Sequence, residues 1–150
     1  MNAKLSLIPI DCDGIPRGYS GSLPEVASEV CRATVDLYRK AGFEEPWIVY
    51  LALADETPVG TCGYKGKPQE GRVEIAYFTF SEFEGCGYAS AMAASLVTIT
   101  REHDPSVVVA AQTLPERNAS HRVLEKLGFR YVDTIDHPED GTVWEWHLIS

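Results

Sequence analysis

The feature that most constrains the fold is a β-type run that leads through two glycines into a helix. Residues 72–80 read RVEIAYFTF, and their β-branched and aromatic side chains predict a strand. Gly85 and Gly87 follow, and the small residues from Gly87 to about Arg101 predict a helix. The first N–H groups of such a helix are unpaired and lie at its positive end, where they can bind phosphate. A tight turn with no ligand also explains the two glycines.

The other predicted elements place this unit in a mixed α/β layer fold. Helices are predicted from Leu23 to Gly42, where Ser22 and Glu25 have the spacing of a capping box, and over residues 118–127. The further predicted strands are 4–10, 47–54, 58–64, 106–113, 129–135 and 142–148. This order predicts one domain over residues 1–150, with a central mixed sheet flanked by helices. A Rossmann unit is excluded, because its glycines follow the first strand and include a third glycine.

Composition narrows the possible partners. A formal net charge of −9 disfavours nucleic acid and suits a cationic partner, although solubility alone explains it too. The four cysteines show neither CxxC spacing nor clustering with histidine, which predicts reduced cytoplasmic thiols and no metal site. The apolar runs are too short for a membrane span or a signal-peptide core. We therefore expect a cytoplasmic protein that binds neither membrane nor nucleic acid.

Two segments together resemble the GNAT acetyltransferase superfamily, and most closely its RimJ/RimL branch, which acetylates protein amino-termini. They read VEIAYFTFSEFEGCGYASAM and, downstream, TLPERNASHRVLEKLGF. The first is similar to the family's strand and pyrophosphate loop, with the pattern Gln/Arg-x-x-Gly-x-Gly/Ala, and the second to its last helix. The likeness covers residues 47 to about 132. It implies a GNAT fold and an acetyl-CoA-dependent N-acetyltransferase that acts on a primary amine by direct transfer, as a monomer or homodimer.

The resemblance also assigns a cofactor site. It implies that strand backbone pairs with the pantetheine arm, that glycine-loop amides hold the pyrophosphate, and that the last helix borders the pantetheine. The implied residues are, in that order, Tyr77, Phe78 and Thr79; Gly85, Cys86, Gly87, Tyr88, Ala89 and Ser90; and Asn118 and Ser120. Arg122 and Lys126 either meet the 3′-phosphate or form a solvated helix face.

Three residues depart from the family pattern. Glu82 stands where the family has Gln or Arg, and Glu84 replaces the usual basic residue before the glycine. Two carboxylates beside a polyanion oppose its binding, although water and salt screen them. Many family members carry a tyrosine, as acid to the leaving thiolate, where this chain has Leu124. The likeness therefore implies a cofactor site with weaker binding and without that acid.

The catalytic residues implied are Glu74, as a base for the amine, and the backbone N–H of Phe78, as donor to the reacting carbonyl oxygen. Glu74 has a structural alternative as the ion-pair partner of Arg72 or a lysine. Cys86 is read as a loop residue in preference to a nucleophile, and His121 as a solvated surface residue in preference to a base.

The last predicted strand has two different faces. Glu145 and His147 share one face and are candidates for the acceptor cleft, while Trp144 and Trp146 on the other are read as core or dimer interface. The acceptor itself stays open. We expect the first helix and loops 11–22, 65–71 and 136–141 to hold it. The alternatives are a GNAT-like module that binds acyl-CoA without turnover and an enzyme that modifies an aminoglycoside or polyamine.

Overall fold

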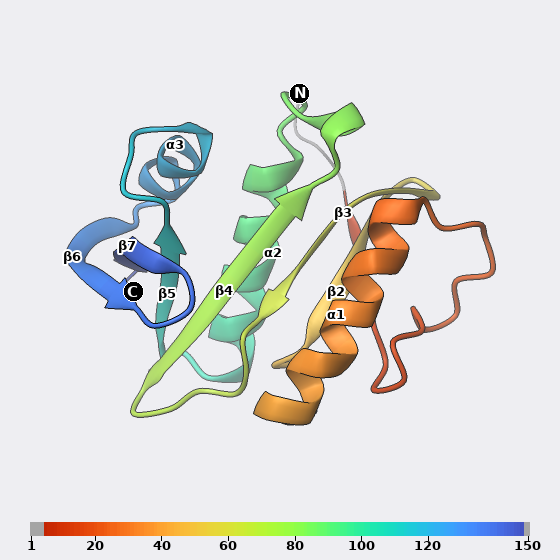
Figure 1. Ribbon diagram of the computed structural model, residues 1–150, viewed down its shortest axis with the longest axis horizontal. Helices are drawn as coiled ribbons and strands as arrows, with labels where there is room; N and C mark the ends of the chain where they lie inside the picture. The colour runs from red at the N-terminus through yellow and green to blue at the C-terminus, as the bar shows by residue number, and fades with distance from the viewer. Residues whose placement is uncertain (1–4, 149–150) are drawn as a thin grey trace.

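A computed structural model describes residues 5–148 as a seven-stranded sheet with helices on both faces (Figure 1). The strands are β1 (Ser6–Pro9), β2 (Val49–Ala54), β3 (Thr57–Tyr64), β4 (Arg72–Thr79), β5 (Val108–Thr113), β6 (Arg130–His137) and β7 (Gly141–Leu148). The helices are α1 (Glu25–Ala41), α2 (Tyr88–His103) and α3 (Ala119–Lys126), and η1 (Ser81–Phe83) is a 3₁₀ turn. The predicted mixed α/β class and element order are confirmed, and residue 4 of the predicted first strand lies outside the described range.

The strand order places one parallel pair in the middle of an otherwise antiparallel sheet. The order is β1-β2-β3-β4-β5-β7-β6, and β4 runs parallel to β5. That pairing joins Arg72–Ile75 to Val108–Ala111 and ends there. Past Ile75, β4 pairs only with β3, and past Ala111, β5 pairs only with β7. The two central strands therefore separate partway along the sheet.

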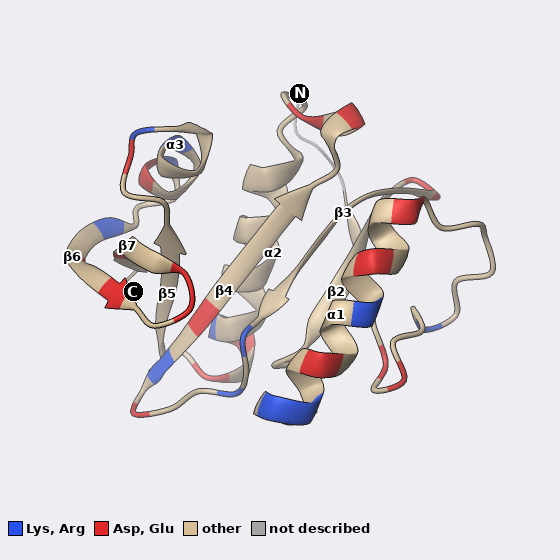
Figure 2. Ribbon diagram, viewed as in Figure 1, with Lys and Arg blue, Asp and Glu red and all other residues tan. Residues whose placement is uncertain are grey.

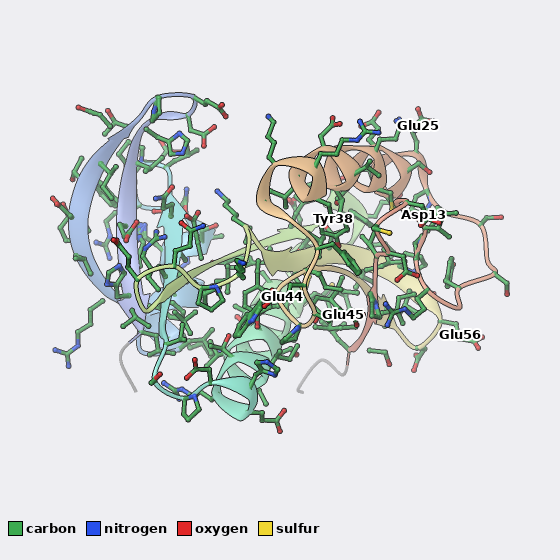
Figure 3. All side chains as sticks on the ribbon, turned by 90° about the horizontal axis from the view of Figure 1, so that it is seen from below. Asp13, Glu25, Tyr38, Glu44, Glu45 and Glu56 are labelled. Carbon is green, nitrogen blue, oxygen red and sulfur yellow. The ribbon has the colours of Figure 1, made fainter. Side chains whose placement is uncertain are left out.

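Helix α1 covers one face of the sheet, opposite α2 (Figure 3). Tyr38 points from α1 toward the sheet, where its hydroxyl donates to the carbonyl oxygen of Ile10 at 2.7 Å. The predicted capping box is wrong: α1 begins at Glu25 after Pro24, and no side chain caps it. Pro24 takes the position next to the helix, which leaves Ser22 two residues too early to cap it.

The larger part of the core lies between the sheet and α2. Met92, Ala93 and Leu96 of α2 are fully buried against this face, as are the neighbouring strand residues. Each fully buried Met or Leu side chain contributes roughly 1.5–3 kcal/mol. Tyr64 fixes the helix further, because its hydroxyl donates to the carbonyl oxygen of Leu96 at 2.8 Å. The middle of α2 is thereby held against β3. Within the described residues, no helix is long and apolar enough to span a membrane.

Candidate functional site

The gap between β4 and β5 exposes backbone groups that a sheet would normally pair. Phe80 donates its N–H to Val59 of β3 at 2.9 Å. Hydrogen-bonding direction alternates along an antiparallel pair, so Phe78, two residues earlier, also faces β3. The backbone groups of Tyr77 and Thr79 therefore face the gap. This alternation contradicts the expected role of the Phe78 N–H as donor to the reacting carbonyl oxygen, because that N–H is directed toward β3 and away from the gap.

A cleft of about 560 Å³ lies beside this gap. Three segments far apart in the sequence form its walls: the end of β4, the turn from η1 into α2, and α3. Its lining consists of Tyr77, Phe78, Thr79, Phe83, Glu84, Gly85, Gly87, Tyr88, Ala89, Ser90, Ala119, Ser120, Arg122, Val123 and Lys126. The structure thus brings together all the predicted cofactor residues except Cys86 and Asn118. The Cys86 side chain is exposed, outside this lining.

The glycine turn gives the cleft an open, positively polarised end. Gly85 and Gly87 have φ of 78° and 84°, which side chains rarely adopt, and an added Cβ at either would meet no atom within 4 Å. Gly87 precedes α2 without a side-chain cap. The first hydrogen bond back to this turn comes from Ala91, whose N–H donates to the Gly87 carbonyl. The N–H groups of residues 88–90 are therefore free to bind an anion.

Thr79 adds a second sign that the cleft fits a polar ligand. Its Oγ1 is buried in the described structure without a hydrogen-bond partner, and the residue lines the cleft. Buried hydroxyl groups are normally satisfied. A ligand lying along β4 would supply the missing partner. The free amides, the open space at the glycines and this hydroxyl all fit a phosphate-bearing ligand with an amide-containing arm.

Helix α3 forms the opposite wall and is held by Asn118. The Oδ1 of Asn118 accepts from the N–H of Ser120 at 3.0 Å and from that of His121 at 3.4 Å. The expected contact of Asn118 with pantetheine is corrected: this side chain caps the helix and does not line the cleft. Ser120 does line it, and Tyr77 reaches across to donate its hydroxyl to the Ser120 carbonyl at 3.5 Å.

The charges around the cleft are mixed. Arg122 and Lys126 of α3 line one wall, which favours their predicted role over a purely solvated face. Glu84 lines the other side, and the exposed Glu82 lies on η1, which appears as an acidic segment in Figure 2. The cations and the backbone amides therefore attract an anionic ligand, while the two carboxylates repel it.

His121 is not the surface residue that the sequence suggested. Its side chain is 1% exposed and packs edge-on against Trp144 and Trp146, with ring centroids 5.1 and 4.7 Å away. The core interpretation is confirmed for Trp146, which is buried and donates its Nε1–H to Thr113 Oγ1 at 3.0 Å. His121 also does not line the cleft, which argues against a role as base. Its spacing on the helix carried no signal of burial, because its aromatic neighbours come from a later strand.

The α1 side of the sheet carries a charged cluster near the gap. Glu74 lies 2.8 Å from the Lys65 ammonium and 3.4 Å from the Arg72 guanidinium. These contacts support the structural alternative for Glu74 and leave its role as a base a prediction. Arg72 also binds both oxygens of the buried Glu145, at 2.7 and 2.9 Å, and His147 Nε2 lies 2.6 Å from Glu145. Glu145 and His147 thus belong to a network that ties β4 to β7.

Glu145 is the strongly perturbed acid of this network. Burial alone would raise its pKa, but hydrogen bonds from Arg72, Gln112 and His147 outweigh that effect and lower the pKa to about 2. Glu145 is therefore a carboxylate at neutral pH. It can orient the imidazole of His147 and neutralise Arg72, but it cannot accept a proton from an amine.

Comparisons with known proteins agree with this geometry. The curated relatives include the N-acetylaspartate synthetases of Rattus norvegicus and Homo sapiens, each 29% identical over 89 residues that make up 59% of the chain. The chain spans only 29% of the length of those relatives.

Solved structures share the fold. RimL, a ribosomal L7/L12 alpha-N-protein acetyltransferase solved with coenzyme A, aligns with TM-score 0.69 at 15% identity over 97% of this chain and 93% of its own. An aminoglycoside acetyltransferase, AAC(6′)-Ib, solved with coenzyme A, aligns with TM-score 0.59 at 20% identity, over 68% and 65% of the two chains. A sequence model described as an acetyltransferase (GNAT) domain matches residues 18–130, three quarters of the chain. The chain therefore belongs to the GNAT acetyltransferase family.

Proposed function

We propose that this protein is an N-acetyltransferase that moves an acetyl group from acetyl-CoA to a primary amine by direct transfer in a ternary complex. The observation that carries the proposal is the gap between β4 and β5, which opens beside a cleft that ends at the unpaired N–H groups of α2. All four cysteines are free thiols, which fits a cytoplasmic location.

The residues around the cleft have complementary roles in holding acetyl-CoA. Tyr77 and Thr79 present backbone N–H and C=O groups to the gap, where the pantetheine amides can pair with them as an added strand would. The N–H groups of residues 85–89 bind the pyrophosphate at the positive end of α2. Arg122 and Lys126 offer charge to the 3′-phosphate. When bound, acetyl-CoA supplies an activated thioester, so the chain mainly positions the amine against it.

The proposed transfer also needs a proton for the departing thiolate. The residue at position 124 is a leucine, which has no proton to donate, and its side chain is fully buried. Tyr77 brings a phenol into the cleft, and burial raises its pKa to about 12, opposed by its hydrogen bond to Ser120. This phenol keeps its proton at neutral pH, and it can therefore serve as the acid that position 124 lacks. The N–H groups of Tyr77 and Thr79 face the gap between β4 and β5. We therefore assign the hydrogen bond to the reacting carbonyl oxygen to the N–H of Tyr77 or of Thr79.

A second candidate function is a module that binds acyl-CoA without turnover. Glu84 in the cleft lining, Glu82 beside it and the missing tyrosine at Leu124 favour this alternative. An aminoglycoside or polyamine enzyme would use the same chemistry with another acceptor, and the relatives named for N-acetylaspartate point instead to an amino acid. The acceptor is thus the property on which these proposals differ.

Calorimetry with coenzyme A, followed by thiol release from acetyl-CoA, tests the proposal. The amine panel contains an amino acid, a peptide with a free amino-terminus, an aminoglycoside and a polyamine. We expect saturable binding, and thiol release that depends on at least one amine. Binding without release for every amine would favour the binding module, and absence of binding would overturn both functions.

A further inference from the structure

We infer that the acceptor carries a carboxylate two to three residue lengths from its reacting amine, as the amino-terminus of an acidic peptide does, and that Lys65 and Lys67 recognise this carboxylate. The inference deepens the proposed function, on which it rests, by naming the class of acceptor for the same site.

The acceptor side is located by a second cavity that shares two lining residues of β4 with the cofactor cleft. This cavity of about 240 Å³ lies between α1 and the sheet, and Ala33, Thr34 and Ala76 help to line it. Tyr77 and Phe78 line both this cavity and the cofactor cleft. A thioester held in the gap is therefore reached from the α1 side through this cavity, which is mostly apolar and suits a neutral amine.

A smaller charged cavity continues along the same strands. It measures about 170 Å³, and Lys65, Lys67, Arg72 and Glu74 line it beside Ala41 at the end of α1. Ala76 is the first residue of β4 beyond its pairing with β5, and Glu74 and Arg72 precede it by two and four positions, which at strand spacing is about 7 and about 13 Å. An acceptor whose amine is at the gap therefore reaches this cavity with a group about 7–13 Å away.

The charges of this cavity favour an anion. Arg72 is committed to Glu145, and the Lys65 ammonium forms an ion pair with Glu74 Oε2 at 2.8 Å without a hydrogen bond to it. Lys67 lies 4.0 Å from Glu44, and both side chains are more than half exposed, so this pair adds little. Glu74 and Glu145 already have cationic partners, whereas the two lysines keep free donors. Although the whole chain is acidic, the free N–H donors of these two lysines can bind a carboxylate at contact distance.

The spacing selects the form of the acceptor. An extended peptide advances about 3.3 Å per residue, so the second to fourth residues lie about 3–10 Å from the amine. A Glu side chain on the third residue then reaches the lysines, while a free α-carboxylate, bonded next to its amine carbon, does not. The structure therefore favours an acidic peptide over a simple amino acid, and an anionic acceptor over an aminoglycoside or polyamine.

Peptide binding tests this inference without relying on turnover. The probes are fluorescent octapeptides with a free amino-terminus, identical except for Glu, Gln or Lys at position 3, measured by anisotropy in the presence of coenzyme A. We expect the Glu peptide to bind at least about fivefold tighter than the Gln peptide at low salt, because charge pairs weaken as salt rises. The Lys67→Glu variant should remove or reverse this order. Lys67 is exposed in a hairpin loop, so the variant should fold normally.

The matched control is Arg101→Glu, which makes the same charge change at an exposed position near the end of α2. It should keep the preference for the Glu peptide. Equal binding of the Glu and Gln peptides, or equal effects of the two variants, would overturn the inference. Thiol release from the same peptides separates this result from the proposed function: release without a Glu preference contradicts only the acceptor class. A Glu preference in binding without release from any amine contradicts only the transferase.

Discussion

At Gly87 the backbone conformation and the open space in front of it can be tested separately. Gly87 has φ of 84° and Gly141, the first residue of β7, has φ of 75°, and an added Cβ meets no atom within 4 Å at either position. Alanine in this left-handed region costs about 1 kcal/mol. We therefore expect Gly87→Ala and Gly141→Ala to lose similar stability in thermal unfolding. Only Gly87→Ala should weaken coenzyme A binding, about tenfold by calorimetry, because its methyl group occupies the space in which the phosphate lies. Equal affinities for the two variants would mean that this turn does not approach the ligand.

Tyr77 provides a second prediction for a single residue. If its hydroxyl protonates the leaving thiolate, Tyr77→Phe should lower kcat by roughly 100-fold and leave KM for acetyl-CoA within about twofold. The measurement is steady-state thiol release with a reactive amine. Tyr131→Phe removes a phenol from an exposed part of β6 and should change neither constant. A rise in KM with kcat unchanged in Tyr77→Phe would show that the hydroxyl only positions the cofactor.

Among the elements, α3 is short and depends on its cap. It spans 8 residues, and Asn118 accepts two of its first N–H groups. Asn118→Ala should cost about 1 kcal/mol and weaken coenzyme A binding several-fold, because Ser120 and Arg122 line the cleft from this helix. Asn118→Asp keeps a capping oxygen and should restore both stability and affinity. If Asp fails where Asn succeeds, the amide contacts the ligand directly, as the family resemblance implied.

The network between β4 and β7 gives a pH dependence. The folded-state pKa of Glu145, about 2, lies below its ordinary value of 4.5, so its stabilising effect is complete above pH 4.5 and is lost as pH falls toward 2. The loss amounts to roughly 3 kcal/mol. Urea unfolding across this range should therefore show a shallower pH dependence in Glu145→Gln than in the natural chain. Glu139→Gln, at an exposed position, should leave the dependence unchanged.

The elements were largely predictable, while the contacts between them were not. Residues 72–101 predicted a strand, a glycine turn and a helix because each of these elements has its own local composition, and the structure has all three. The parity that turns Phe78 toward β3 depends on register, which the strand's own residues do not encode. His121 is buried because two tryptophans from β7 pack against it, and Asn118 caps α3 because the helix starts one residue later than its composition suggested.

Over the whole molecule, net charge and local charge lead to different expectations. The chain carries −9, which the sequence suggested would attract cationic acceptors, yet the charged cavity at Lys65 and Lys67 favours an anion. A field from the whole surface is screened within a Debye length of about 10 Å at 0.1 M salt, whereas charges that line a cavity act at contact distance. The sequence lists the charges but not which of them share a cavity, so the acceptor could not be deduced from the net charge.

The distinction between net charge and local charge also decides how Glu82 and Glu84 affect the binding of coenzyme A. Glu84 lines the cleft and Glu82 is close to it in sequence, so replacing both with Gln should tighten coenzyme A binding about three- to tenfold at about 0.02 M salt. The gain should shrink below about twofold at about 0.5 M, where screening is strong. Glu56→Gln with Glu102→Gln changes the net charge equally at exposed positions on a hairpin turn and on the end of α2. If this control tightens binding as much as the loop variant, the repulsion comes from the overall charge, and the carboxylates beside the glycine turn have no special effect on the pyrophosphate.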